Sequence, residues 1–376
     1  MGHLPVPQDP LPEHIEPIIH EAVSNPQIWV VPQGSARATP VFRQVFLCRR
    51  NQSTQAYQII QPPAFQPVEL SHGGPIWGYL FMGVLIPRRH DLIYEEPIDD
   101  AYAQRVAIKR LDLRVVALEL QNGSKEDPFK EIYRMQTIGD NHHVLGIIEA
   151  LQDDRYLYII TPWCEGGSLL THIPLQPGDL TLDQQARILF EQILENLHYL
   201  NRVKGICHRD IKPGNFLVSG EGRVLLSDLA MSFQMPPGGL VNHIGQFGTP
   251  PYMLPEIAMR SPFDGSKCDL WASIVSLYNL VTGLPFLYRI PHPDDILFRY
   301  CIMAKGLSRD MHNELVQEII AEANPEDLMS LNTVAQRISS MSMNLLELFE
   351  NALALDPDDR WTIEEVAACR WMQLER

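Results

Sequence analysis

The sequence predicts an α+β protein of two lobes, with a small β-rich N-terminal lobe and a larger helical C-terminal lobe. Three observations support this prediction. Short runs rich in β-branched and aromatic residues prevail up to about residue 161. Beyond Pro255, apolar residues recur at helical spacing almost throughout. Between the two parts, the Gly166-Gly167 pair interrupts regular structure and is typical of a hinge.

Residues 1–75 form a proline-rich extension ahead of these lobes, which we place at about 76–161 and 168–376. The density of proline excludes long helices, because each proline lacks an amide donor and clashes with the preceding turn. Two strand-like runs, Val41–Cys48 and Tyr57–Ile60, are compatible with a small hairpin or with a disordered lead. The extension either docks a partner protein through extended proline segments, packs on the small lobe, or does neither.

The composition is that of an ordinary globular protein, with 45% apolar and 20% charged residues. The net charge of −16 disfavours binding to nucleic acid, whose phosphates would be repelled. Six scattered cysteines without a C-x-x-C pair argue against a zinc site and a disulfide framework. The N-terminus lacks a signal-peptide pattern, and no apolar run reaches the roughly 18 residues of a membrane helix. We therefore expect a cytoplasmic or nuclear protein with neither nucleic-acid nor membrane partners.

A lysine and a glutamate stand out in the N-terminal half. Val106-Ala-Ile-Lys109 is a short β-branched strand that ends in a lysine. The run Glu126–Gly139 has helical periodicity, and Asp127-Pro128 supplies an N-cap and a first turn. Glu131 lies at the edge of the apolar face of that helix. This position lets its carboxylate point towards the strand lysine.

A loop with an acid, a base and an amide follows a long amphipathic helix that contains Leu189 and Leu197. The loop reads His208-Arg-Asp210-Ile-Lys212-Pro-Gly-Asn215. Side chains of these types at this spacing are suited to handling phosphate and a metal ion. A predicted hairpin with strands Phe216–Val218 and Arg223–Leu226 comes next, and Asp228-Leu-Ala230 follows it.

These segments together resemble protein kinases of the eukaryotic serine/threonine type. Their order in the chain is that of the family's motifs: Val106–Lys109, Glu131, the hinge, His208–Asn215, Asp228–Ala230, Gly248–Tyr252 and Leu254–Glu256. The resemblance covers residues 76–376, about four-fifths of the chain, and it implies the two-lobed kinase fold and protein substrates. Asp210-Ile-Lys212 has the form found in serine/threonine kinases rather than in tyrosine kinases.

The resemblance implies how the γ-phosphoryl group of ATP would be transferred to a protein hydroxyl. Asp210 would accept the proton of the substrate hydroxyl, and Lys212 would neutralise charge on the transferred phosphoryl group. Thr249 would lie beside both. Phosphoryl transfer depends mainly on positioning and electrostatic stabilisation, so these residue types fit the roles.

The same resemblance assigns the nucleotide and metal ligands. Lys109 would bind the α- and β-phosphates of ATP, oriented by an ion pair with Glu131. Asn215 and Asp228 would bind Mg²⁺ through oxygen. The remaining nucleotide contacts are assigned to two glycines of a phosphate loop, to residues around adenine and to one ribose contact: Gly78, Gly83, Leu85, Ala107, Thr161, Pro162, Cys164, Ser168 and Leu217.

One further pair is implied by the resemblance to have a structural role. Glu256 and Arg360, the latter in Asp356-Pro-Asp-Asp-Arg360, resemble the buried ion pair that braces the substrate-binding segment of kinases. Truncation of either residue would leave an unpaired buried charge.

The sequence departs from the family pattern at three places. Leu80 occupies the central glycine position of the phosphate loop, and Ala230 replaces the glycine of D-F-G. Between Ala230 and Gly248, Ser232 is the only hydroxyl side chain, so we predict activity that does not depend on phosphorylation of this loop. The alternative to an active enzyme is a pseudokinase, an ATP-binding scaffold without turnover.

Overall fold

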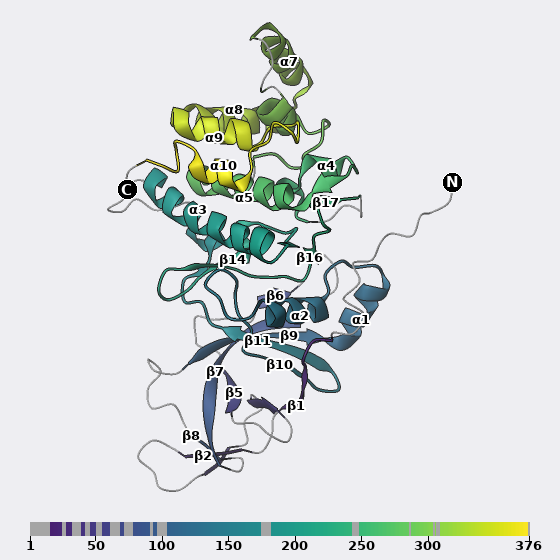
Figure 1. The fold of residues 1–376 in the computed structure, drawn as a ribbon, viewed down its shortest axis with the longest axis vertical. Coiled ribbons are helices and arrows are strands. Elements are labelled where there is room, and N and C mark those ends of the chain that lie inside the picture. Colours follow the sequence, from purple (N-terminus) through teal and green to yellow (C-terminus); the bar gives the residue numbers. More distant parts are fainter. Residues whose placement is uncertain are drawn as a thin grey trace. The chain divides into compact units, whose positions relative to one another are not determined.

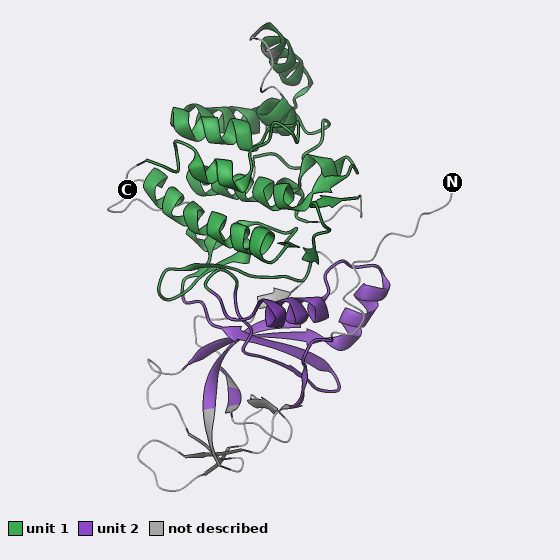
Figure 2. Ribbon diagram, viewed as in Figure 1, with its two compact units in different colours: residues 1–10, 142–144, 166–376 green, residues 11–141, 145–165 purple. Residues whose placement is uncertain are grey.

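The computed structural model describes residues 16–24, 28–31, 39–41, 46–49, 55–60, 68–70, 78–90, 93–95, 104–173, 182–242, 248–285, 287–303, 305 and 309–374. The chain divides into two compact units, which Figure 2 shows in different colours. Of the described residues, 16–141 and 145–165 with the gaps given above belong to unit 2, and 142–144 and 166–374 belong to unit 1. The last boundary along the chain, between Glu165 and Gly166, lies at the Gly166-Gly167 pair.

In its described residues, unit 2 is built on one sheet of 11 strands with two helices (Figure 1). The strands are β1 (His20–Ser24), β2 (Ile28–Val31), β3 (Thr39–Val41), β4 (Phe46–Arg49), β5 (Gln55–Ile60), β6 (Val68–Leu70), β7 (Gly78–His90), β8 (Ile93–Glu95), β9 (Arg105–Asp112), β10 (Glu149–Gln152) and β11 (Tyr156–Pro162). The helices are α1 (Leu113–Gln121) and α2 (Pro128–Ile138). β4 and β5 pair antiparallel. Of the two alternatives given for the strand-like runs of the extension, a hairpin or a disordered lead, the hairpin is therefore the one that forms.

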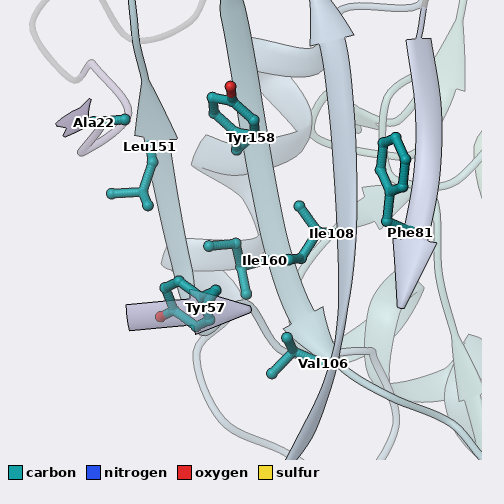
Figure 3. Packing of buried hydrophobic residues seen from close by; sticks show 8 residues of the cluster. All are labelled: Ala22, Tyr57, Phe81, Val106, Ile108, Leu151, Tyr158 and Ile160. Atoms are coloured by element: carbon teal, nitrogen blue, oxygen red, sulfur yellow. The ribbon is translucent and has the colours of Figure 1, made fainter. Parts of the chain in front are cut away.

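The sheet closes on itself because β7 pairs with both β5 and β9. The order around the ring is β7–β5–β4–β1–β10–β11–β9, and β9 is hydrogen-bonded to β7 again. Strands β1, β4 and β5 come from the proline-rich extension and bridge β7 and β10. Side chains alternate between the two faces of each strand, and those on one face form an apolar core inside the ring around Tyr57, Val106 and Ile160 (Figure 3).

The other face of the sheet packs against α1 and α2. A second apolar core, which includes Leu111, Val116 and Ile132, lies there. The N-terminus of α2 is set by Asp127, whose side chain accepts hydrogen bonds from two amides of the first turn at 2.9 and 3.3 Å. The helix and the N-cap expected from the sequence are therefore confirmed.

Unit 1 is mainly helical and carries several small sheets (Figure 1). Its helices are α3 (Leu182–His198), α4 (Pro255–Ala258), α5 (Gly265–Thr282), α6 (Ile296–Phe298), α7 (Arg309–Glu322), α8 (Pro325–Ser339), α9 (Met343–Ala352) and α10 (Ile363–Ala368). Its strands are β12 (Gly167–Ser168), β13 (Ile206–Cys207), β14 (Phe216–Val218), β15 (Val224–Leu226), β16 (Phe233–Gln234), β17 (Leu240–Val241) and β18 (Phe263–Asp264). β14 and β15 pair antiparallel, which confirms the hairpin predicted after the loop His208–Asn215, from here on called the catalytic loop.

The helical spacing of apolar residues beyond Pro255 predicts one continuous helix over residues 335–355, whereas the structure has the end of α8 and all of α9 in this stretch. Ser340 ends α8, and Ser342 begins α9 because its side chain accepts a hydrogen bond from the amide of Leu345 at 3.3 Å. The apolar periodicity continues across this break, and periodicity alone therefore did not reveal it.

Helix α5 forms the centre of unit 1. Nearly all of its 18 residues are buried, including Asp269 and Trp271. It begins after Asp264, whose carboxylate accepts hydrogen bonds from the amides of Ser266 and Lys267, at 2.8 and 3.3 Å. Among the residues that the structure describes, no helix is both long and apolar enough to cross a membrane.

Candidate active site

Asp269 in α5 holds the catalytic loop in place. This fully buried carboxylate accepts hydrogen bonds from the backbone amides of His208 at 2.7 Å and Arg209 at 2.9 Å, and from the side chain of Asn201 at 2.8 Å. The φ of Arg209 is 69°, which is uncommon for a residue other than glycine, and the bonds to Asp269 stabilise this conformation. The sequence pattern beyond Pro255 indicates only helix at Asp269, because the role of this residue depends on a contact 61 residues away.

Asp210 lies at the centre of a cluster of hydrogen-bond donors in unit 1. Its Oδ1 accepts from the hydroxyl of Thr249 at 2.8 Å and from the Thr249 amide at 3.2 Å. Its Oδ2 accepts from Lys212 Nζ at 2.6 Å and from Asn215 Nδ2 at 3.1 Å. Lys212 also donates to the Thr249 hydroxyl at 3.0 Å. The structure thus brings together four residues that the sequence placed at the site.

The surroundings of Asp210 keep it ionised. Burial, with 6% of the residue exposed, by itself raises the pKa of the carboxyl. The charge of Lys212 and the hydrogen bonds from Lys212 and Thr249 outweigh this effect, so the pKa lies below the ordinary value of 3.8. A carboxylate in this state is able to accept a proton from a hydroxyl group beside it.

His208 connects the catalytic loop to the segment that carries Asp228. Its Nδ1 accepts from the Asp210 amide at 3.3 Å, and its Nε2 lies 2.9 Å from the carbonyl oxygen of Ser227. The tautomer with the proton on Nε2 satisfies both bonds. The amide and the hydroxyl of Ser227 in turn donate to the carbonyl of Asn215, at 2.8 and 2.9 Å. Asp228 therefore follows a residue that is bound to both ends of the loop.

Asn215 and Asp228 have the donor chemistry of a Mg²⁺ site. The Nδ2 of Asn215 donates to the carbonyl oxygen of Asp210 at 2.7 Å, so its Oδ1 is left to bind a cation. Asp228 has a φ of 65°. Such a left-handed residue costs roughly 1–3 kcal/mol, and residues of this kind cluster at functional sites. Both side chains offer oxygen, which Mg²⁺ prefers, so the residues present fit the ion.

Lys109 and Glu131 form an ion pair within unit 2. Lys109 Nζ and Glu131 Oε2 are 2.8 Å apart, and the Glu131 side chain is only 6% exposed. The lysine comes from β9 and the glutamate from α2, so the pair ties the sheet to the helix. A lysine ammonium has three donors, so one such group is able to bind a carboxylate and an anion such as a phosphate at the same time. The sequence expected this contact, and the structure contains it.

The residues assigned to adenine and ribose include one cross-strand pair in each unit. Ala107 in β9 lies opposite Thr161 in β11, and Thr161 is buried. Leu217 in β14 lies opposite Ser168 in β12. Directly opposite residues share one face of a sheet, so each pair presents its side chains together.

Pro162 and Cys164 lie where β11 ends. Pro162 is exposed and is the last residue of the strand, a position that tolerates the missing amide. The next amide, of Trp163, donates to the carbonyl of Arg105 at 3.3 Å. Pairing between β9 and β11 therefore extends to Trp163. Cys164, which the sequence assigns to the adenine contacts, is the next residue.

The structure places Gly78 and Gly83 in a strand rather than in a loop. Both belong to β7, where Gly78 lies opposite Leu111 and Gly83 lies opposite Val106 of β9. On its other edge, β7 pairs with β5 at Gly83 and with β6 at Gly78. Backbone groups that are paired within a sheet are no longer available to cradle a phosphate. A continuous strand therefore replaces the phosphate loop expected over residues 78–83.

The glycine pattern can also be aligned with the sequence from Gly73, five residues before Gly78, and this second frame agrees with the strand. Gly73-Gly-Pro-Ile-Trp-Gly-Tyr-Leu80 also matches G-x-G-x-x-G-x-V, with proline at the central position. In this frame the third glycine, Gly78, opens β7, and Leu80 lies opposite Lys109. A Cβ atom at Gly78 would collide with the carbonyl of Arg110, so the close approach of β7 and β9 requires glycine there. The sequence signal for this frame was the pair of glycines that opens it.

Leu85 does not share a face with Ala107. It packs against the core inside the ring. Successive side chains of a strand point to opposite faces, and Ala107 and Lys109 alternate away from that core. The apolar β7 residues on the face of Ala107 and Lys109 are Met82 and Leu80, which lie directly opposite them. Leu80 and Met82, rather than Leu85, therefore share the face of Ala107 and Lys109.

A buried ion pair braces the segment that follows Thr249. Arg360 Nη1 and Nη2 donate to Glu256 Oε1 and Oε2 at 2.8 and 3.3 Å. Arg360 is 2% exposed, and it also donates to the carbonyl oxygens of Ala354 and Leu355 at 3.0 and 3.2 Å. The expected pair is therefore present, and backbone acceptors take up the remaining guanidinium donors.

Named proteins with similar sequences are kinases. Sperm motility kinase 2A of Mus musculus is 36% identical over 150 residues, which is 40% of this chain and 29% of that protein. Sperm motility kinase 3A of Mus musculus is 29% identical over 235 residues, 62% of this chain and 40% of that protein. Serine/threonine-protein kinase kin-29 of Caenorhabditis briggsae is 29% identical over 242 residues, 64% of this chain and 25% of that protein. The chain thus spans less than half the length of each of these relatives.

The family model for the protein kinase domain matches residues 96–372. This span includes the Lys109–Glu131 pair, the Asp210 cluster and the Glu256–Arg360 brace. It begins beyond β7, so the ring strands from the extension lie outside it. A match over most of the chain, with these contacts formed inside it, shows that the chain belongs to the protein kinase family.

Proposed function

We propose that the protein is an active serine/threonine protein kinase, which transfers the γ-phosphoryl group of ATP to protein hydroxyls in the presence of Mg²⁺. The observation that carries this proposal is the binding of both Asp210 carboxylate oxygens by Lys212, Asn215 and Thr249. Phosphoryl transfer needs an acceptor for the hydroxyl proton and positive charge beside the phosphoryl group. Asp210 and Lys212 supply both within hydrogen-bond distance of each other.

Unit 2 contains candidate ligands for the phosphates of ATP, and unit 1 contains candidate ligands for the metal ion. Lys109, oriented by Glu131, would bind the ATP phosphates, and Asn215 with Asp228 would hold Mg²⁺. Bound Mg²⁺ neutralises charge on the phosphates. Within unit 2, the ion pair with Glu131 orients Lys109, and within unit 1, the bond to the Asp210 carbonyl orients Asn215.

The preference for serine and threonine over tyrosine is supported by Asp210-Ile-Lys212 and by the name of the relative kin-29. Peptide libraries with Ser, Thr or Tyr as the sole acceptor, assayed with Mg-ATP, test this preference. We expect phosphate incorporation into the serine and threonine libraries and none above background into the tyrosine library. Equal labelling of the tyrosine library would contradict the proposed class.

An ATP-binding scaffold without turnover is the second candidate. Ala230 favours it, because this buried alanine stands where a glycine would let the segment change conformation. Retention of Lys109, Asp210, Asn215 and Asp228 favours the active enzyme, because a scaffold does not require all four. A single-turnover reaction with labelled ATP separates the two, since a scaffold would bind the nucleotide and release it unchanged.

Arg209 is engaged by neighbouring groups of unit 1. Its Nε donates to the carbonyl oxygen of Met231 at 2.6 Å. Its guanidinium carbon lies 4.8 Å from the centroid of the Phe233 ring. A carbonyl and an aromatic face both attract this cation, so the arginine is held without a covalent modification nearby.

Kinase activity is expected to be independent of phosphorylation in the segment between Ala230 and Gly248. Ser232, the one hydroxyl side chain in this stretch of sequence, is 2% exposed and donates to the carbonyl of Leu229 at 2.6 Å. A modifying enzyme therefore has no access to it unless the segment opens. Phosphatase-treated protein and the Ser232→Ala variant should both retain the activity of untreated wild type, with heat-inactivated phosphatase as the control. Loss of activity together with a lost phosphate mapped to Ser232 would contradict this expectation.

A further inference from the structure

The N-terminal extension is bound directly to α2, the helix that carries Glu131. The amide of Ile18 donates to Gln136 Oε1 at 2.9 Å, and Gln136 Nε2 donates to the carbonyl oxygen of Ile18 at 2.7 Å. A side-chain amide that is bound through both of its polar atoms is held in one orientation. The two residues are 118 positions apart, so the contact belongs to the folded lobe rather than to local structure.

Ile19 adds an apolar contact beside these hydrogen bonds. It is partly buried and packs against the core that contains Val116 and Ile132. Ile132 directly follows Glu131 in α2. The extension therefore contacts this helix through a polar group at Gln136 and through the core beneath Ile132.

The contacting residues are carried by a strand that is fixed on both edges. β1 begins at His20, one residue after Ile19, and pairs parallel with β10 and antiparallel with β4. Ala22 within β1 is 1% exposed and belongs to the core inside the ring (Figure 3). Ile18 and Ile19 are thus presented to α2 from the sheet rather than from a free tail.

The contact at Gln136 and the ion pair at Glu131 act on one rigid helix. The two residues are five positions apart in α2, which is about 7.5 Å along the helix axis. The ion pair requires Glu131 Oε2 to stay 2.8 Å from Lys109 Nζ. The ion pair and the two bonds to Ile18 each depend on the position of this helix, so both contacts hold α2 in one place.

We propose that residues 16–24 brace α2 in the position that the Lys109–Glu131 pair requires, and that Gln136 is a positioning residue for phosphoryl transfer. This inference rests on the proposed kinase function and extends it to how the site is kept active. The brace lies within the chain and needs no covalent modification. It agrees with the burial of Ser232 and the engagement of Arg209.

The variant Gln136→Ala removes both hydrogen bonds and leaves Glu131 in place. Thr137→Ala is a matched control, because Thr137 is exposed and its hydroxyl donates to the Tyr133 carbonyl of the same helix at 2.8 Å. We expect kcat for peptide phosphorylation to fall about tenfold in Gln136→Ala, which corresponds to about 1.4 kcal/mol. The KM for the peptide should stay unchanged, and Thr137→Ala should retain the wild-type kcat.

Two further measurements separate positioning from loss of folded protein. First, kcat is normalised to the concentration of nucleotide-binding sites, so that a partly unfolded sample does not mimic the effect. Second, amide hydrogen exchange is followed in the absence of nucleotide. Amides of α2 should exchange faster in Gln136→Ala than in Thr137→Ala, whereas amides of α5 should exchange at the wild-type rate.

Exchange of α2 that is the same in Gln136→Ala and Thr137→Ala would overturn the brace, whether or not the protein transfers phosphate. Faster exchange of α2 with an undiminished kcat would overturn the positioning role and leave the kinase function standing. If wild type and variants all bind Mg-ATP without transferring phosphate, the positioning role fails together with the proposed function. The exchange result then still decides whether residues 16–24 hold α2.

Discussion

Asp210→Asn is expected to abolish phosphoryl transfer while Mg-ATP binds nearly as tightly as to the wild type. The substitution keeps the size of the side chain but removes the charge that accepts the hydroxyl proton and that pairs with Lys212 at 2.6 Å. General base catalysis contributes about 10²–10⁴-fold to a rate, so kcat should fall by about 10³-fold. Calorimetric titration with Mg-ATP measures binding separately, because Lys109 and Asp228 are unchanged.

Asp154→Asn is the matched control for this variant. Asp154 is an exposed carboxylate in the turn between β10 and β11, far along the sequence from the catalytic loop. It should keep the wild-type kcat. Undiminished turnover in Asp210→Asn would refute the role of this carboxylate as proton acceptor.

Arg360→Met is expected to destabilise unit 1 by about 3–5 kcal/mol, because it leaves the buried Glu256 carboxylate without its partner. Arg360 also lies over the ring of Trp271, with its guanidinium carbon 4.9 Å from the ring centroid. Trp271 is fully buried. Urea unfolding followed by tryptophan fluorescence therefore reports on this region.

Arg202→Met breaks an exposed ion pair and serves as the comparison. Arg202 Nε and Glu364 Oε1 are 3.1 Å apart, and the side chains are 40% and 53% exposed. Exposed pairs of this kind contribute about 0–1 kcal/mol. If the two arginine variants unfolded at the same urea concentration, the brace at Glu256 would not have the assigned energetic role.

The catalytic cluster was predictable because most of it is local in the sequence. Asp210, Lys212 and Asn215 lie within six residues of one another, and a hairpin follows immediately. Lys109 and Glu131 come from a strand and a helix with clear periodicity and a clear N-cap. Short spacing and regular periodicity leave few alternatives for how such side chains meet.

The glycine assignment failed because two frames fit the same pattern. Gly78 serves as the first glycine in one frame and as the third in the other. Only strand register separates them, since Gly78 lies opposite Leu111 within a paired strand. The assignment of Leu85 to the adenine contacts was wrong for the same reason. The two frames begin five residues apart, and a shift by an odd number of residues moves a side chain to the opposite face of a strand.

The ring and the brace depend on contacts that are too distant for sequence patterns to reveal. β1 pairs with β10 at His20 and Leu151, and Ile18 meets Gln136 across 118 residues. The proline-rich composition of residues 1–75 masked this role, because it predicts only the absence of long helices. Asp269 is similar, since its importance lies in the loop amides that it binds and not in its helix.

The most direct test of the kinase site is the transfer of labelled γ-phosphate from Mg-ATP to a serine/threonine peptide library by the full chain after phosphatase treatment. We expect incorporation that requires Mg²⁺, disappears with EDTA and is lost in Asp210→Asn. Saturable binding of Mg-ATP without any incorporation into the library would contradict the proposed activity and would identify the protein as a nucleotide-binding scaffold.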